Sequence, residues 1–309
     1  MSAAPSKHTN LPVRNFGPVY TAPMTIWFTV FFLAPLLIIV LYSFLRKGLY
    51  GGVVMGDFTP DAYRSLSNPS FVIITLRTLA TALIATFITI FLALPCGYFM
   101  ARSKNQTFLL LLIIIPFWTN FLIRVFAWMN ILGNNGFLND LLIRIGLIDS
   151  YINFLYNQGS VVLVLVYMYL PYAILPLFST IDKFDFSLLE AARDLGATKA
   201  QSIFRVLLPN IKSGLYTAVL FTFIPIFGAY AVPLLVGGKD SYMLGNVIAD
   251  QLTKARNWPL ASAISMVLTV ITTAGVLIML NLQRKDAEGR ERPSRRSRTA
   301  VRKNKGGGT

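Results

Sequence analysis

This sequence contains few charged residues and few cysteines. Of its 309 residues, 13% are Asp, Glu, Lys or Arg and 55% are hydrophobic, whereas a soluble domain carries about 25% charged residues to cover its surface. Water is therefore not the main solvent of this chain. Cys96 is the single cysteine, which excludes an intrachain disulfide, and we expect it to pack inside the apolar run that surrounds it.

Side chains that ligate metals or bind nucleotides are equally scarce. His8 is the single histidine, and no Asp, Glu or Cys lies near it in the N-terminal sequence, so it lacks the further ligands of a metal site. Gly237, Gly238 and Lys239 are followed by Asp240, whereas a phosphate-binding loop has Ser or Thr there. We therefore expect no catalytic residue, no bound metal and no cofactor on this chain.

What the sequence does contain is long apolar segments. A helix of about 20 residues crosses the hydrocarbon core of a bilayer. We predict an all-α polytopic membrane protein with six transmembrane helices, at residues 26–45, 78–100, 108–132, 161–181, 214–236 and 259–282. The first segment is too long for a cleaved signal peptide and no small-residue cleavage site follows it, so we expect it to stay as an anchor.

The charges between these segments favour a topology with both termini in the cytoplasm. The inner segments would then hold 19 Lys and Arg and the outer segments 8, as the positive-inside rule requires. Most of this excess lies in the C-terminal tail and in the connection between the fourth and fifth segments. We therefore divide the chain into a cytoplasmic N-terminal segment (1–25), a six-helix domain (26–282) and a basic cytoplasmic tail (283–309).

The tail combines ten Lys and Arg with Ser and Gly. Such a composition cannot bury a core, which indicates disorder near anionic lipid headgroups. No aromatic residue interleaves the charges to stack on bases, so we do not expect the tail to bind nucleic acid.

The connection at 182–212 has clear helix boundaries. Ser187 and Glu190 have the spacing of a capping box, and Gly196 is the residue type best suited to a left-handed C-terminal cap, so we predict a short helix between them. Thr198 and Gln201 repeat the capping-box spacing and open a second helix.

This second helix should end near Pro209, because proline removes a backbone donor. Apolar residues fall on one face of each helix, and they need a cover. Either the membrane surface or a groove on a soluble partner fits. These residues are Leu188, Ala192 and Leu195 on the first helix, and Ile203 and Leu207 on the second.

Glu190-Ala191-Ala192, then Gly196 after three residues and Val206-Leu207-Leu208-Pro209 after nine more, resembles the cytoplasmic EAA loop of binding-protein-dependent ABC importer permeases. Val206 stands where the family pattern has Ile. The resemblance implies a type I ABC importer permease fold in a bacterial inner membrane. It also implies a coupling helix that engages an ATPase subunit, with contact or loop-shaping roles for Glu190, Ala191, Ala192, Gly196, Leu208 and Pro209.

The same resemblance implies the partners. Two ATPase subunits would bind and hydrolyse ATP with Mg²⁺, a second permease chain would complete the pathway, and a periplasmic binding protein would deliver the substrate. ATP-driven closure of the ATPase subunits would then tilt the helices in an alternating-access cycle.

A further resemblance covers most of the chain. Residues 116–124, 146–149, 190–197, 245–248 and 257–259 are similar to the spermidine/putrescine permease group, which implies polyamine uptake. Permeases for other solutes share the scaffold, so another small solute stays open. An ion-gradient-driven carrier and a purely structural membrane scaffold are the competing classes, and the lack of ionisable residues in mid-membrane disfavours the carrier.

A polyamine in transit needs carboxylates, carbonyls or aromatic faces in place of water. The six segments contain no Asp or Glu, so we expect aromatic faces and backbone carbonyls to line its path. For each aromatic residue, ordinary packing is the competing interpretation. The candidates are Phe117, Trp118, Tyr167, Tyr169, Phe227 and Tyr230, with Asp240 and Asp250 attracting cations at the outer mouth.

Arg124 is the only charged residue in the six segments. A straight third helix would raise it about 24 Å, close enough to the outer surface for its side chain to reach lipid headgroups. A fixed cation would repel a polyamine, so we favour a structural or gating-interface role over substrate contact.

After the third segment, a run of apolar residues predicts a short helix on the outer surface, where the binding protein could land. The residues are Phe137, Leu138, Leu141, Leu142 and Ile145.

Overall fold

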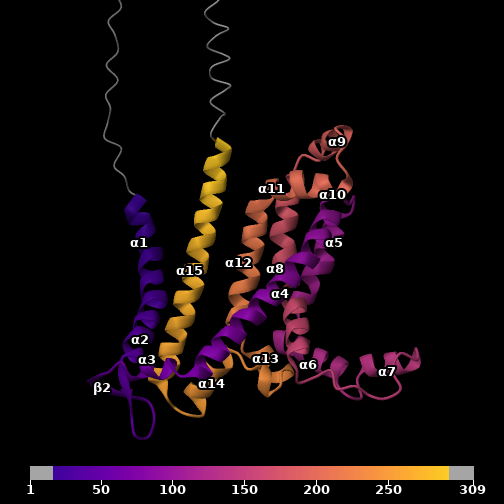
Figure 1. Cartoon of the computed structure of the whole chain (residues 1–309). Helices are drawn as coiled ribbons and strands as arrows, with labels where there is room; N and C mark the ends of the chain where they lie inside the picture. The colour runs from indigo at the N-terminus through magenta and orange to yellow at the C-terminus, as the bar shows by residue number, and fades with distance from the viewer. Residues whose placement is uncertain (1–16, 292–309) are drawn as a thin grey trace, which may run out of the picture.

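The computed structural model describes residues 17–291, so the first part of the predicted N-terminal segment and the tail from residue 292 lie outside the described residues. Long helices run side by side between two ends (Figure 1). The start of α1 and the end of α15 lie at the same end as the short helices α9 and α10. A hairpin and the helices α7, α13 and α14 lie at the opposite end.

Four helical stretches are long and apolar enough to cross a membrane: Thr21–Ser43, Pro69–Arg102, Gln158–Asp182 and Trp258–Lys285. Two bent helix pairs raise the number to six if each pair is one span: Gln106–Trp118 with Phe121–Arg144, and Lys199–Asn210 with Lys212–Phe227. The first stretch joins α1 (Gly17–Phe28), a π-helical turn (Thr29–Leu33) and α2 (Ala34–Ser43); the others are α4 (Pro69–Arg102), α8 (Gln158–Asp182) and part of α15 (Trp258–Glu291).

The third predicted segment is not a straight helix, and that expectation was wrong. It consists of α5 (Gln106–Ile114), a 3₁₀ turn (Ile115–Trp118) and α6 (Phe121–Leu132). The helical stretch before the break, Gln106–Trp118, and the stretch after it, Phe121–Arg144, differ in direction by 92°. Pro116 opens the 3₁₀ turn, and Asn120 starts α6 because its Oδ1 accepts the Leu122 N–H at 2.8 Å.

The fifth predicted segment is interrupted as well. α12 (Lys212–Phe227) ends before Gly228, and α13 (Ala231–Val236) follows. α14 (Leu244–Thr253) supports the gap, because the Asn246 side chain donates to the Tyr230 carbonyl at 3.0 Å. Gly245 permits this approach, since a Cβ there would lie 2.5 Å from the Ala229 carbonyl oxygen.

Other boundaries also move. α4 begins nine residues before the predicted start, so Arg77, which directly precedes the predicted second segment, lies within a helix. α15 continues through 291, so the first residues of the predicted tail are helical. The end opposite α9 also contains a small antiparallel sheet that the all-α prediction missed, formed by β1 (Leu45–Lys47) and β2 (Val53–Phe58). α3 (Asp61–Leu66) follows the sheet, and a 3₁₀ turn (Lys239–Ser241) lies later in the chain.

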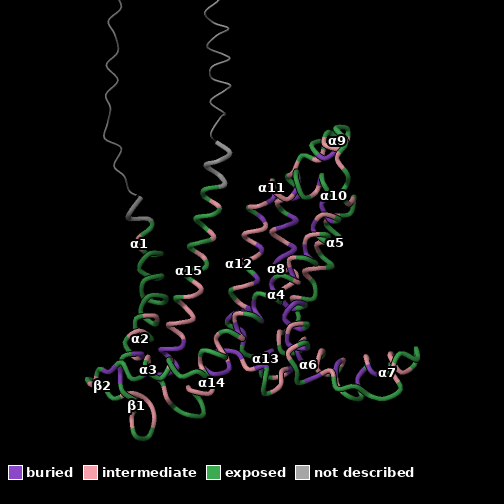
Figure 2. Tube along the Cα trace, viewed as in Figure 1, coloured by how far each residue is buried: buried purple, intermediate pink, exposed green. Residues whose placement is uncertain are grey.

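Burial is concentrated on α4, α8 and α12, which form two buried clusters along their length (Figure 2). Small residues allow α4 and α8 to approach closely: a Cβ on Gly97 would lie 3.3 Å from the Phe178 backbone nitrogen. In contrast, the most apolar window of the first span has 0% of its residues buried by the described part of the chain. Its cover therefore comes from lipid or from another protein.

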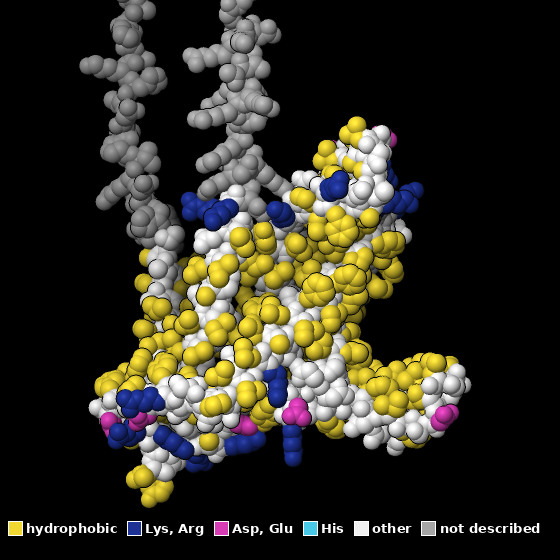
Figure 3. All heavy atoms as spheres, viewed as in Figure 1, with side chains coloured by type: hydrophobic (Ala, Val, Ile, Leu, Met, Phe, Trp, Pro, Cys, Tyr) yellow, Lys and Arg dark blue, Asp and Glu magenta, His cyan; other side chains and the backbone are white. Residues whose placement is uncertain are grey.

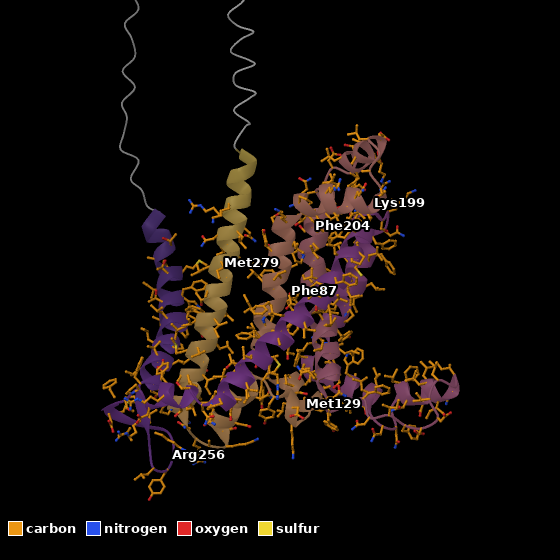
Figure 4. The ribbon with its side chains drawn as sticks, viewed as in Figure 1. Phe87, Met129, Lys199, Phe204, Arg256 and Met279 are labelled. Atoms are coloured by element: carbon orange, nitrogen blue, oxygen red, sulfur yellow. The ribbon has the colours of Figure 1, made fainter. Side chains whose placement is uncertain are left out.

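The surface agrees with a membrane environment. The middle of the visible face is mainly hydrophobic, and Lys and Arg gather toward the two ends (Figure 3). An apolar cleft lies between α4, α12 and α15 and is lined in part by Phe87, Phe223 and Met279 (Figure 4).

Candidate functional site

The 182–212 loop folds into four short pieces at one end of the bundle. They are α9 (Ser187–Asp194), α10 (Lys199–Ser202), a π-helical turn (Ile203–Leu207) and α11 (Leu208–Asn210). The last three pieces form one helical stretch, Lys199–Asn210, and a bend of 75° separates it from α12. The loop thus contains a first short helix, α9, and a second helical piece from Lys199 to Asn210, as predicted.

The start of α9 differs from the prediction. Asp185 caps this helix, because its Oδ1 accepts the Ser187 N–H at 3.0 Å, and Ser187 and Glu190 form no capping box. Hydrogen bonds from Ser187 lower the pKa of Asp185 below its usual value. An ionised carboxylate at this position also interacts favourably with the positive end of the helix dipole.

The end of α9 follows the prediction closely. Gly196 has a φ of +87°, and its N–H donates to the Arg193 carbonyl at 2.8 Å while the Ala197 N–H donates to the Ala192 carbonyl at 3.0 Å. This pattern is a Schellman motif. Apart from its two chain neighbours, no described residue lies within 4 Å of the position that a Gly196 Cβ would occupy.

The second predicted capping box is present. The Gln201 N–H donates to Thr198 Oγ1 at 3.2 Å, and the Thr198 N–H donates to Gln201 Oε1 at 3.0 Å. Pro209 lies in the first turn of α11, which ends one residue later. Local hydrogen bonds and one proline thus set both ends of the second helical piece.

Burial gives α9 two different faces. Leu189 is only 1% exposed and shares a buried cluster with Leu207, whereas Leu195 is 90% exposed and Leu188 is also exposed. Leu188 and Leu195, which were predicted to need a cover, are therefore accessible to a partner, whereas Ala192 is half-buried. On the second piece, Ile203 and Leu207 pack into the same buried cluster of this chain, so the cover predicted for them comes from the chain itself and not from a membrane surface or a partner.

Four exposed apolar or small residues of α9 and its C-terminal cap form what we call the α9 tip: Leu188, Ala191, Leu195 and Gly196. The tip lies at the outermost point of this end of the molecule, and Lys199 and Phe204 are nearby on the following piece (Figure 4). Of the six residues predicted to couple, Glu190, Ala191 and Gly196 are exposed, and Ala192, Leu208 and Pro209 are half-buried.

Two of the predicted path residues, Phe117 and Tyr169, both contact Tyr172 near the break in the third segment. The Phe117 ring packs edge-on against Tyr172 with 5.3 Å between centroids, and Tyr172 lies 5.8 Å from Tyr169. The Arg124 guanidinium lies over the Phe117 ring, 5.0 Å from its centroid. Arg124 therefore turns onto this aromatic cluster rather than toward the outer headgroups. Tyr172 was not among the predicted residues, although its i, i+3 spacing from Tyr169 was a usable signal.

The other aromatic candidates lie elsewhere. Tyr167 packs against Trp128 at 5.2 Å, away from the Phe117 cluster. Trp118 is 82% exposed, and Tyr230 is also exposed. Phe227 is completely buried in the cluster that also contains Val125 of α6 and Leu165 of α8. In this conformation it therefore has the packing role that was the competing interpretation.

The two acidic candidates lie at the end opposite the α9 tip, in and beside α14. Asp240 is exposed in the 3₁₀ turn that follows α13. Asp250 pairs with Lys254 at 2.8 Å and accepts the Tyr242 hydroxyl at 2.8 Å. The Lys254 hydrogen bond, and then that of Tyr242, lower the pKa of Asp250. Lys254 therefore offsets much of the negative charge that Asp250 would present to a cation.

The predicted outer helix is present as α7 (Phe137–Arg144). Its buried anchor is Asn139, a residue that the apolar pattern did not reveal. The Asn139 amide donates to the Ile152 carbonyl at 2.9 Å and accepts the Ile152 N–H at 3.0 Å. In the part of the chain that the structure describes, no group of three metal-ligating side chains comes together.

Comparison with known proteins extends this picture. The family model described as "Binding-protein-dependent transport system inner membrane component" matches residues 14–285. The spermidine/putrescine transport system permease protein PotB of Escherichia coli is 38% identical over 254 residues, which cover 82% of this chain and 92% of that protein. The protein of the same name from Haemophilus influenzae is 38% identical over 261 residues, or 84% of this chain and 91% of the relative.

A solved structure shares the fold. The crystal structure of a bacterial ABC transporter involved in the import of the acidic polysaccharide alginate aligns with a TM-score of 0.71 over 88% of this chain and 97% of the other. Its sequence is 16% identical to this one. At that identity the similarity establishes the helical permease fold alone.

Proposed function

Because this chain belongs to the family of binding-protein-dependent transport system inner membrane components, we propose that it is the polyamine permease of an ATP-driven importer. The chain is a multi-pass transport subunit of the bacterial inner membrane. In our proposal it receives spermidine or putrescine from a periplasmic binding protein. Two separate ATPase subunits hydrolyse ATP with Mg²⁺, and a second permease chain completes the pathway.

The α9 tip is the observation that carries the coupling role. It is an apolar, exposed surface on a helix whose two ends are held by local hydrogen bonds. Leu189 and Leu207 tie the loop to a buried cluster that also includes Ile181 of α8 and Ile211 at the start of α12. A partner that pulls on the tip therefore moves α8 and α12 together, since these helices are continuous with the loop on either side.

The proposed topology has six spans with both termini in the cytoplasm. It counts α5 with α6, and α12 with α13, as one broken span each. Broken spans are stable in a membrane where the freed backbone groups find protein partners, as the Tyr230 carbonyl does with Asn246. The described chain ends lie on the same side as the α9 tip, in keeping with an even number of crossings (Figure 1).

The second permease chain is proposed from two surfaces. The first span has an apolar face that the described part of this chain leaves uncovered, and the apolar cleft between α4, α12 and α15 is open on one side. A single bundle of this shape does not enclose a pathway.

The substrate proposal rests on the identity to proteins named as spermidine/putrescine permeases and on the aromatic cluster at Phe117. Cations bind to aromatic faces with about 0.5–2 kcal/mol per contact. A permease for another small solute is the alternative, since the same fold also occurs in a transporter involved in the import of the acidic polysaccharide alginate.

The test is ATPase stimulation in the reconstituted four-subunit complex. We expect the binding protein loaded with spermidine or putrescine to stimulate hydrolysis, and the same protein exposed to glutamate or maltose to have no effect. Stimulation by an unrelated solute alone would contradict the polyamine assignment. Uptake that proceeds without ATP but collapses with a protonophore would favour the ion-gradient-driven carrier instead.

A further inference from the structure

The position of Arg124 is unusual for a cation in a membrane helix. Arg124 lies in the first turn of α6, and its N–H donates to the Asn120 carbonyl at 3.3 Å. The N-terminal end of a helix carries partial positive charge and disfavours a cation. The helix therefore does not explain why an arginine is held here.

The aromatic cluster does explain it. The Arg124 guanidinium lies 5.0 Å from the Phe117 centroid, and Phe117 in turn contacts Tyr172. The faces of such rings attract cations electrostatically. The Arg124 Nε is buried and has no hydrogen-bond acceptor among the residues that the structure describes. Attraction to the Phe117 ring is thus a main source of stabilisation for the Nε side of the Arg124 guanidinium.

The cluster is also reachable from outside the chain. Tyr172, the α8 residue that contacts Phe117, is exposed. The break at Thr119 and Asn120 separates α5 from α6. A change of direction at this break would lift Arg124 off the ring without unfolding either helix.

We propose that Arg124 is a resident cation, which occupies in the resting permease the aromatic site that an alkylammonium group of the substrate occupies during transit. This inference rests on the proposed polyamine function. When the substrate arrives, one of its ammonium groups replaces the guanidinium over Phe117, and Arg124 returns once the substrate has passed. The exchange keeps one positive charge at the cluster throughout, so the rings are never left with two mutually repelling cations.

The proposal also accounts for the absence of acidic residues from the predicted spans. A carboxylate beside Arg124 would pair with it and hold it permanently. Aromatic faces attract the guanidinium and the ammonium by the same physics, so neither cation is trapped. Arg124 is a gating and positioning residue in this account, and the substrate contact is made by Phe117 and Tyr172.

The first test replaces Arg124 by Gln in proteoliposomes that contain the two permease chains and the ATPase subunits. Without ATP or binding protein, we expect R124Q to leak spermidine at least about tenfold faster than the wild type, because the resting site is vacant. Arg124→Lys should stay tight. Ile123→Ala, which changes an exposed neighbour, serves as the matched control and should also stay tight.

Chemical rescue makes the test specific. Free guanidinium ion at millimolar concentration should slow the leak through R124Q and leave the wild type unchanged. If R124Q is correctly assembled but does not leak, or if guanidinium has no effect on its leak, the resident-cation role is wrong. A purely structural arginine would lower ATPase activity and assembly together with no leak.

A second variant covers the case in which R124Q does not assemble. Phe117→Leu removes the aromatic face and keeps the charge. We expect uptake to fall about tenfold while polyamine-loaded binding protein still stimulates ATP hydrolysis. Equal loss of both activities would overturn the proposal. If polyamine fails to stimulate the wild type, the proposed function fails and this inference with it; normal wild-type stimulation with unchanged F117L uptake refutes the inference alone.

Discussion

Gly196 shows how one residue shapes the coupling loop. Its φ of +87° is costly for a residue with a Cβ, and two backbone hydrogen bonds depend on that conformation. Because the space around it is empty of other described residues, a larger side chain would not clash with them. The space must still accommodate the partner that covers the α9 tip.

We therefore predict different effects for three substitutions of Gly196. Asn tolerates a left-handed backbone and should retain ATPase capture. Val adds about 1–2 kcal/mol of backbone strain and should reduce capture. Trp should reduce capture further, because it also fills the space that the ATPase needs. Co-purification of the tagged ATPase subunit measures the result.

Gly56 provides the matched control. It has a φ of +90° and open space around it, but it lies in β2 at the opposite end. Gly56→Trp should leave ATPase capture unchanged. Equal losses for the two Trp variants would mean that strain, and not contact with a partner, explains the Gly196 result.

Asp185 makes the start of α9 dependent on pH. Hydrogen bonds from Ser187 lower its pKa in the folded loop, so the cap stabilises α9 above the unfolded pKa of about 4 and is lost as the pH falls through the lower, folded value. We predict slow amide exchange at Glu190 down to about pH 4, with faster exchange below it. Asp185→Asn, which still accepts the hydrogen bond, should remove this dependence; a persistent pH effect in that variant would contradict it.

At the scale of secondary-structure elements, α9 has one anchoring face and one presenting face. Leu189 faces the buried cluster and Leu195 faces outward, six residues later on the same loop. The same substitution at the two positions should therefore separate folding of the loop from contact with a partner.

We predict that Leu189→Ala destabilises the permease by about 2–5 kcal/mol, because it opens a cavity in the loop anchor. Leu195→Ala should change stability by no more than about 0.5 kcal/mol and still weaken ATPase capture. Thermal unfolding in detergent and co-purification of the ATPase give the two readings. Normal capture by Leu195→Ala would show that the tip is not the contact surface.

At the scale of the whole molecule, the two ends should face different compartments. The hairpin end carries Leu49, which is 100% exposed, and the other end carries Ala191 on the α9 tip. We predict that an impermeant maleimide labels Leu49→Cys from the periplasmic side of intact cells, and labels Ala191→Cys only after permeabilisation. Cys96→Ser is the background for both variants. Labelling of Ala191→Cys in intact cells would reverse the topology and exclude the coupling role.

The breaks in the third and fifth segments lie near the same end of the molecule, opposite the α9 tip. There, α6, α13 and α14 depart from simple crossings and bring side chains such as Arg124 and Tyr230 near backbone breaks. Closing or opening at this end requires only changes of direction at those breaks.

Several of these features could be predicted from the sequence because their causes are local. Apolar length and the scarcity of charge identify the membrane as the solvent, and α8 begins and ends within three residues of its prediction. The left-handed Gly196 and the Thr198–Gln201 capping box depend on groups within five residues of each other. Such interactions form in the same way whatever the rest of the chain does.

Only the tertiary structure decided the remainder. Apolar composition does not distinguish a straight span from one that breaks at Asn120 or Gly228, because the freed backbone groups are satisfied by distant residues such as Asn246. Leu189 rather than Leu188 is buried because Leu207 lies on that side. Arg124 turns inward because Phe117 and the α8 tyrosines offer a cation-binding face that no local pattern reveals. Contacts between residues far apart in the chain set these choices, and their geometry exists only once the helices have packed.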